Sequence, residues 1–201
     1  IPNMDVRLEL LRPGQDEPLV VADSRGLGEG EQLPNVPIET GRYLIRVREQ
    51  GVEGKLPTEN VSDAYYVRWR LLDEDAAFER EPNDSLELAE PLELGADRRG
   101  WIGWPGDVDT FCLSTDAQDV IAQVSALRGV DLILRAVDRR TDRSRKFDDN
   151  GMGRGETSNT WRNAEAGKLC VEVSADAREE GGHIAQPNET YGVRFIAVPG
   201  N

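Results

Sequence analysis

The chain is poor in the residues that most enzymes use for acid–base or nucleophilic chemistry. It has one histidine, His183, and two cysteines, Cys112 and Cys170. A Ser-His-Asp or Cys-His set would need His183, whose neighbours are typical of a surface loop. Neither cysteine has a near partner at the spacing of a metal site. We therefore expect a non-catalytic protein.

Long apolar runs and an excess of basic charge are also missing. No segment approaches the roughly 20 apolar residues that span a bilayer. The chain has 24 Lys and Arg against 38 Asp and Glu, which gives a formal net charge of −14. Such a chain repels nucleic-acid phosphates and anionic membrane surfaces. We expect no nucleic-acid partner and no direct membrane insertion. The charge favours divalent cations, although an acidic surface also serves solubility alone.

What the sequence does contain is an internal repeat. Residues 5–8 resemble residues 131–134, and Tyr65-x-Val67-Arg68 recurs as Tyr191-x-Val193-Arg194, both at an offset of 126. The glycine-rich turn at residues 23–31 recurs at residues 148–156, one residue out of step. Ordered matches of this kind indicate two copies of one supersecondary pattern.

The first copy is incomplete. Residues 1–75 correspond to the C-terminal half of a copy, and residues 76–201 form a complete one. The counterparts of residues 81–126 would lie before Ile1. We expect that the natural protein continues upstream, or that another segment supplies these strands, because a half sandwich leaves strand edges and core faces open. Assembly through the incomplete first copy is one consequence.

Period-two alternation predicts β-strands in both copies, at residues 43–47, 67–69, 169–173 and 193–195. Turns rich in Gly, Pro, Asp and Asn separate the predicted strands. We expect an all-β fold of antiparallel β-sandwich or jelly-roll-like modules in tandem. The alternation places Trp69 on the core side of its strand.

An acidic segment opens the second copy. Four oxygen-bearing side chains lie within six positions, and an Asp-x-Asp pair follows. Calcium takes six to eight oxygen ligands, and alternate residues of an extended chain point to one side. The segment is therefore either a calcium site or a solvated acidic linker. The residues concerned are Glu79, Glu81, Asn83, Asp84, Asp107 and Asp109.

These motifs resemble the bacterial pre-peptidase C-terminal (PPC) domain family. The resemblance rests on Glu-Pro-Asn-Asp-Ser at 81–85, Gly-x-Ile-Gly at 100–103 and Gly-Asp-Val-Asp-x-Phe at 106–111. It covers about residues 79–198. It implies a β-sandwich appended to secreted proteases, similar to the collagen-binding domains of bacterial collagenases, and it implies that the same six acidic-segment residues bind calcium. Thr110 departs from the family, which commonly has Trp or Tyr there.

Two further pairs of residues are candidates for a disulfide and for a partner contact. Cys112 and Cys170 share an outward-facing parity and form a disulfide if their strands are neighbours; the alternative is two free thiols. Trp101 and Trp104 flank a turn near the acidic segment, where either one contacts a partner or packs at the rim of the core.

The sequence thus predicts a calcium-binding accessory module of a secreted or cell-surface bacterial protein, attached to a polymer or protein partner. Two other functions stay open: a structural spacer or assembly subunit of an extracellular complex, and a processing or secretion module of a secreted protease. In each case we expect an extracytoplasmic location, whether secreted, cell-surface or periplasmic.

Overall fold

The computed structural model describes residues 1–23, 25–51, 54, 56, 58–176 and 185–199. Throughout these ranges the chain forms strands, turns and loops and no helix, so none of the described residues forms a helix that could span a membrane. The predicted all-β fold is confirmed. The strands are β1 (Val6–Leu11), β2 (Val20–Ala22), β3 (Leu44–Glu49), β4 (Glu90–Leu92), β5 (Arg98–Gly100), β6 (Val108–Leu113), β7 (Ala117–Val124), β8 (Leu132–Asp138), β9 (Arg143–Phe147), β10 (Trp161–Ala164), β11 (Leu169–Ala175) and β12 (Tyr191–Ala197).

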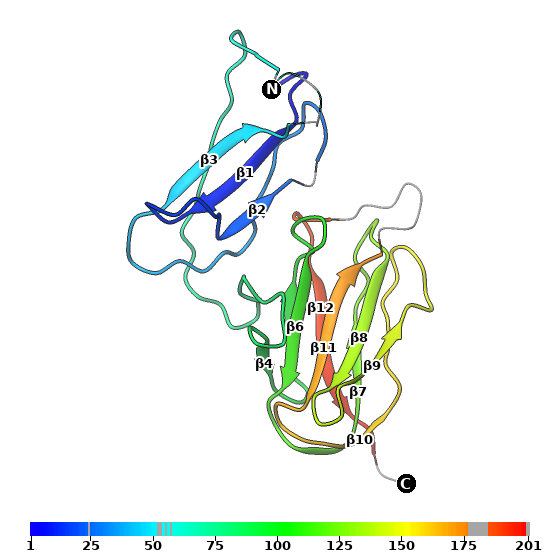
Figure 1. The fold of residues 1–201 in the computed structure, drawn as a ribbon. Coiled ribbons are helices and arrows are strands. Elements are labelled where there is room, and N and C mark those ends of the chain that lie inside the picture. Colours follow the sequence, from blue (N-terminus) through cyan, green and yellow to red (C-terminus); the bar gives the residue numbers. More distant parts are fainter. Residues whose placement is uncertain (24, 52–53, 55, 57, 177–184, 200–201) are drawn as a thin grey trace.

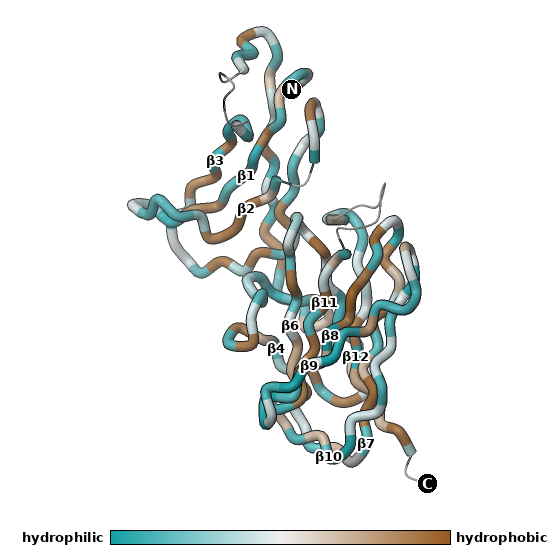
Figure 2. The backbone as a smooth tube through the Cα atoms, turned by 45° about the vertical axis from the view of Figure 1, so that its right-hand side comes forward, coloured by the Kyte–Doolittle hydropathy of each residue, from teal (hydrophilic) through white to brown (hydrophobic). Residues whose placement is uncertain are grey.

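The strands from β4 onward form a sandwich of two sheets (Figure 1). One sheet has the order β10-β7-β12-β5 and the other β4-β6-β11-β8-β9. Alternate side chains of both sheets point inward and form one hydrophobic core, which includes Phe111, Leu134, Val171 and Phe195, all with no exposed surface. The hydrophobic stretches of the tube in Figure 2 run along these strands.

In the N-terminal unit, residues 1–75, the described residues form one three-stranded sheet of order β2-β1-β3. This sheet has the order and register of β9-β8-β11. Leu8 pairs with Val47 as Leu134 pairs with Val173, at the offset of 126 that the sequence repeat shows. The repeat in sequence therefore corresponds to a repeat of strand pairing.

The strand predicted around residues 67–69 does not form. Residues 65–71 run extended without ladder hydrogen bonds, and Trp69 is 73% exposed rather than facing a core. Its counterpart Phe195 lies in β12, between β5 and β7, with no exposed surface. The prediction was wrong because a strand needs neighbours, and the described part of the N-terminal unit contains no counterpart of β5 or β7.

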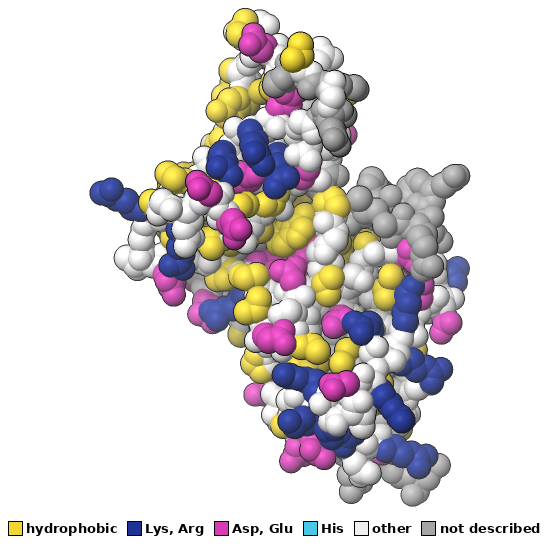
Figure 3. All heavy atoms as spheres, viewed as in Figure 1, with side chains coloured by type: hydrophobic (Ala, Val, Ile, Leu, Met, Phe, Trp, Pro, Cys, Tyr) yellow, Lys and Arg dark blue, Asp and Glu magenta, His cyan; other side chains and the backbone are white. Residues whose placement is uncertain are grey.

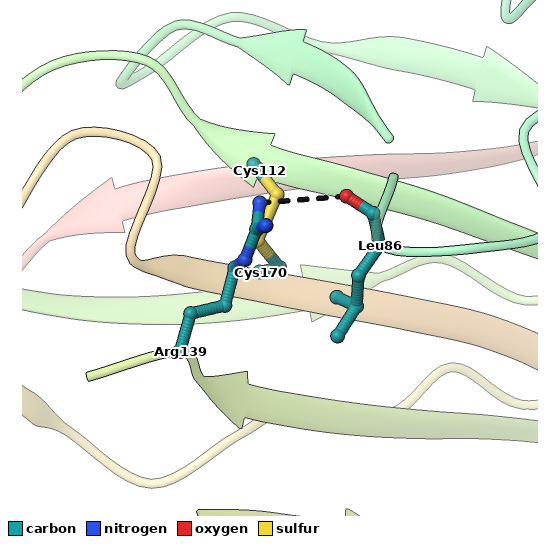
Figure 4. The surroundings of a disulfide bond; sticks show 4 residues. All are labelled: Leu86, Cys112, Arg139 and Cys170. Carbon is teal, nitrogen blue, oxygen red and sulfur yellow. Dashed lines mark hydrogen bonds between the residues drawn. A yellow bond between two sulfur atoms is a disulfide. The ribbon is translucent and has the colours of Figure 1, made fainter. Parts of the chain in front are cut away.

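Cys112 and Cys170 lie opposite each other in the pairing of β6 with β11 and are joined by a disulfide (Figure 4). Their side chains point away from the core, as the parity predicts, yet Cys170 has no exposed surface. The turn at residues 85–88 covers this face of the sheet, and Arg139 Nη1 donates a hydrogen bond to Leu86 O at 3.4 Å across the disulfide.

Candidate metal centre

The acidic segment reaches its site by running beside β5. A bridge joins Phe78 to Arg99, and Glu79 N donates to Arg99 O at 2.8 Å. In this extended stretch the side chains of Glu79, Glu81 and Asn83 point inward and are buried. The intervening residues and Asp84 face solvent. The inward alternation agrees with the period of two that the sequence shows.

The Asp-x-Asp pair comes from the start of β6. A turn at residues 104–107 precedes this strand, with Asp107 N donating to Trp104 O at 3.2 Å and Gly106 at a φ of 84°. A positive φ is a conformation that glycine adopts more readily than other residues, which is why glycine is common in such turns. Asp107 and Asp109 then project to one side of β6, and both are buried. The hydrogen bond from Thr110 N to Asn83 O, at 3.1 Å, holds the two segments together.

Two groups of carboxylates result, and Glu81 belongs to both. Glu79, Glu81 and Asp109 offer oxygens within 4.8 Å of one another, as do Glu81, Asp84 and Asp107. The first group is buried, and the second reaches the surface at Asp84. The structure therefore brings together five of the six residues proposed as ligands, and Asn83 lies between two of them in the chain.

Several oxygens of the site are buried without a hydrogen-bond partner. Asp107 Oδ2 accepts from Gly103 N at 2.5 Å, and Asp109 Oδ2 accepts from the hydroxyl of Tyr191 at 2.5 Å. The second oxygen of each carboxylate has no partner, nor has the side-chain oxygen of Asn83. Buried polar atoms nearly always have a partner, so three such oxygens in one site are an unusual concentration of unsatisfied acceptors.

The pKa values of the site carboxylates are also raised, because their charges are buried close together. Burial raises the pKa of Glu81 to about 7, with the charge of Asp84 adding to the rise. Burial likewise raises the pKa of Asp107 to about 8, helped by the charge of Glu81. For Asp109 and Glu79, burial and then a neighbouring carboxylate raise the pKa well above the ordinary value. Without a cation, the site relieves the repulsion by holding protons.

Glu79 is held by a backbone hydrogen bond to one of its two carboxylate oxygens. Trp101 N donates to Oε1 at 2.6 Å, and the Tyr191 hydroxyl lies 3.4 Å from Oε2. The single proton of the Tyr191 hydroxyl is donated to Asp109, so Oε2 of Glu79 does not receive it. Glu79 is therefore fixed against Trp101, and Glu81 is shared between the two carboxylate groups.

Tyr191 is the site residue that sequence reasoning missed. Its hydroxyl lies between Asp109 and Glu79, with no solvent exposure of the ring. Its only sequence signal was the recurrence of tyrosine at positions 65 and 191, which also fits a core aromatic. Gly100 makes room for this contact, because a Cβ there would overlap both Glu79 and Tyr191.

The N-terminal unit contacts the site through residues 32–35. Asn35 Nδ2 donates to the backbone oxygen of Glu79, and Pro34 lies against Gly103. Beside this contact is an open groove of about 400 Å³. Its walls are Arg7, Leu19, Val20, Val21 and Asp23 on one side and Pro82, Asp84, Trp104 and Pro105 on the other.

The two tryptophans singled out in the sequence have different surroundings. Trp101 stacks on Phe78, with ring centroids 5.2 Å apart, and is packed at the rim. Trp104 lines the groove next to Asp84. A partner contact by either residue stays a prediction. His183 lies outside the described residues.

The glycine-rich turns are held by a carboxylate of the chain itself. Glu156 Oε1 accepts from Asn150 N at 2.8 Å, and Glu31 Oε1 accepts from Arg25 N at the same distance in the first copy. The same bond at equivalent positions gives the recurring glutamate a structural role in shaping the turn.

Comparison with known proteins gives a limited result. No family model matches the chain, and no curated protein matches it. Among solved structures, the chain is similar to the pre-peptidase C-terminal domain of a collagenase from Bacillus anthracis. The identity is 18%, the match covers 53% of this chain and 93% of that one, and the TM-score is 0.37. A likeness at this level does not say what this chain binds.

Proposed function

We propose that the chain is a non-catalytic calcium-binding module of a secreted or cell-surface protein, in which the cation fixes the segment between the N-terminal unit and the sandwich. The observation that carries this proposal is the set of buried oxygens without partners on Asn83, Asp107 and Asp109. A bound cation would satisfy them and stabilise the ionised carboxylates by its positive charge.

The donor set favours calcium over other ions. All the candidate ligands are oxygens, and the site holds neither a cysteine nor a described histidine, the ligands that zinc prefers. Magnesium usually keeps several waters and binds one or two carboxylates. Here Glu81, Asp84 and Asp107 lie close together and Asp109 lies behind them, a density of protein oxygens that suits calcium.

A binding role fits the site better than hydrolysis. Paired carboxylates also cleave glycosides, but that reaction needs a sugar ring between them. Glu79 and Asp109 have no exposed surface, so no ring reaches them. The disulfide between Cys112 and Cys170 supports an extracytoplasmic location, since such bonds persist in oxidising compartments.

The groove beside Asp84 is where we place attachment to a protein or polymer partner. Both units contribute to its walls, and Trp104 offers an aromatic surface within it. A cation bound by Glu81, Asp84 and Asp107 would fix the wall that carries Pro82 and Trp104, so partner binding would depend on calcium.

Calcium titration with thermal unfolding tests the proposal. Excess calcium should raise the melting temperature over that in chelator, because a ligand of the folded state adds about 2.7 kcal/mol at 100 times its dissociation constant. For a domain of this size that is a shift of several degrees. Isothermal titration should give one site in the parent protein.

Amide variants provide the controls. Glu81→Gln and Asp107→Asn keep the side-chain shape and remove the charge, so each should abolish the calcium shift. Glu87→Gln removes an exposed carboxylate three residues after Asp84 in the sequence and should leave the shift intact. If calcium stabilises all three variants equally, or leaves the parent unchanged, the site does not bind calcium.

A further inference from the structure

The N-terminal unit exposes positions that are core in the sandwich. Three of its side chains are 43–73% exposed, while the residues 126 positions later are fully buried. Figure 3 shows hydrophobic side chains at the surface of this unit. The exposed residues are Ile45 (43%), Val67 (44%) and Trp69 (73%), and their buried counterparts are Val171, Val193 and Phe195.

The sandwich shows what covers these positions. Strand β6 pairs with β11 on the side away from β8, and it places Phe111 opposite Val171. Strands β5 and β7 lie on either side of β12. In the described part of the N-terminal unit, β3 pairs with β1 alone, and residues 65–71 pair with no strand. The uncovered edge and face correspond to strands β5, β6 and β7.

An open cavity of about 300 Å³ lies where the core of this unit would be. Its walls include Val6, Leu8 and Val47 of the sheet and Tyr65 and Val67 of the extended segment. The counterparts of all five belong to the core of the sandwich: Leu132, Leu134, Val173, Tyr191 and Val193. The cavity is therefore an unfilled core, with one sheet present and the other incomplete.

We propose that this face is an acceptor for β-strands donated by another polypeptide segment, one with the strand pattern of residues 79–124. Strand addition supplies main-chain hydrogen bonds to an open edge, and alternate side chains of the donor fill the pockets. The donor completes the N-terminal unit as a second sandwich. This surface is separate from the candidate calcium site, and neither proposal requires the other.

The acceptor defines the chemistry of its donor. The strand beside β3 carries a large apolar residue opposite Ile45, as Phe111 lies opposite Val171. It needs no cysteine, because Leu44 stands where the sandwich has Cys170. Tyr65 corresponds to Tyr191, whose hydroxyl donates to Asp109, so the donor carries a carboxylate for the Tyr65 hydroxyl.

A second copy of this chain does not fit as the donor. Its own β6 and β7 are committed to its sandwich, where Phe111 and Val120 have no exposed surface. Two N-terminal units packed face to face would bury apolar side chains but leave the edge of β3 and the backbone of residues 65–71 unpaired, which is costly in a buried interface.

The probe for this acceptor is a polypeptide of residues 76–126 carrying Cys112→Ser, added to the full chain. Hydrogen exchange of the full chain is then followed by mass spectrometry. We expect the amides of residues 44–49 and 65–71 to exchange at least tenfold more slowly with the probe, in a one-to-one complex. Donor variants Phe111→Ser and Val120→Ser should lose this protection, as should an Ile45→Ser, Val67→Ser acceptor.

Three results would overturn the proposal. The first is unchanged exchange at residues 65–71, both with the added probe and with the same segment fused ahead of Ile1. The second is protection in the chain alone that rises with its concentration, which would identify a second copy as the occupant. The third is equal protection by the serine-substituted donors, which would mean non-specific apolar cover. Calcium binding is measured separately at Glu81, so failure of one proposal leaves the other standing.

Discussion

Glu9 of β1 lies directly opposite Arg46 of β3, whereas the equivalent pair in the sandwich, Arg135 and Glu172, has the charges exchanged. Both pairs form ion pairs across the strands. Their surroundings differ, because the Glu9 side chain has no exposed surface and is also paired with Arg7 at 2.7 Å and Arg48 at 2.9 Å. Basic side chains gather over this sheet in Figure 3.

Glu9→Gln should therefore destabilise the protein more than Glu172→Gln. Burial raises the pKa of Glu9, but the hydrogen bonds from Arg46 and Arg7 outweigh it and leave the pKa lowered. Loss of this charge leaves three arginines facing one another, at a cost of about 1.5–3 kcal/mol. The more exposed pair in the sandwich contributes less than about 1 kcal/mol. Urea unfolding of the two variants measures the difference, and equal losses would contradict this expectation.

Stability without metal should fall as the pH rises from about 5 to 8. The folded protein holds protons on Glu81 up to a pKa of about 7 and on Asp107 up to about 8, whereas the unfolded chain releases them near pH 4. Between these values the folded state binds more protons, so raising the pH favours unfolding.

Calcium should reverse this trend, since its ligands must be ionised. The gain in melting temperature from calcium should be small at pH 5 and largest at pH 8. Calorimetric scans in chelator and in calcium across this range check both statements. A metal-free protein that gains stability between pH 5 and 8 would show that these carboxylates are already ionised in the folded state.

Gly100→Ala should weaken the site without removing any ligand. The added methyl group overlaps the carboxylate of Glu79 and the hydroxyl of Tyr191, both of which are buried, so these two side chains must shift. We expect a loss of about 1–3 kcal/mol in stability, typical of overpacking, and a calcium affinity at least tenfold lower. Gly41→Ala is the matched control, because a Cβ there has no neighbour within 4 Å. Similar behaviour of the two variants would argue against the close packing.

Removing the disulfide should destabilise the sandwich by about 4 kcal/mol in the chain-entropy model, given a sequence separation of 58 residues between its cysteines. The double variant Cys112→Ser, Cys170→Ser should unfold at the same urea concentration with and without reductant. The parent should match it only when reduced. A parent whose unfolding is insensitive to reductant would mean that the bond does not form in solution.

The local parts of this structure were predictable from sequence, and the contacts between distant strands were not. The inward set of Glu79, Glu81 and Asn83 follows from the period of two, and the turn before Asp107 follows from its Pro-Gly pair. The role of Tyr191 depends on β12 passing behind β6, which no local pattern encodes. The prediction for Trp69 failed because the alternation of side chains shows which residues share a face of a strand. That face becomes buried only when a second sheet covers it.

The acidic segment and the end of β12 lie at opposite ends of the sandwich (Figure 1). Residue 79 runs beside Arg99, and β5 pairs with β12 at its start, where Tyr191 lies opposite Gly100. A pull between residues 79 and 197 would therefore act along β12, across hydrogen bonds that lie perpendicular to the strands. Such a pull loads these bonds together in shear, so β5 and β12 would separate in one concerted step rather than unzip one hydrogen bond at a time.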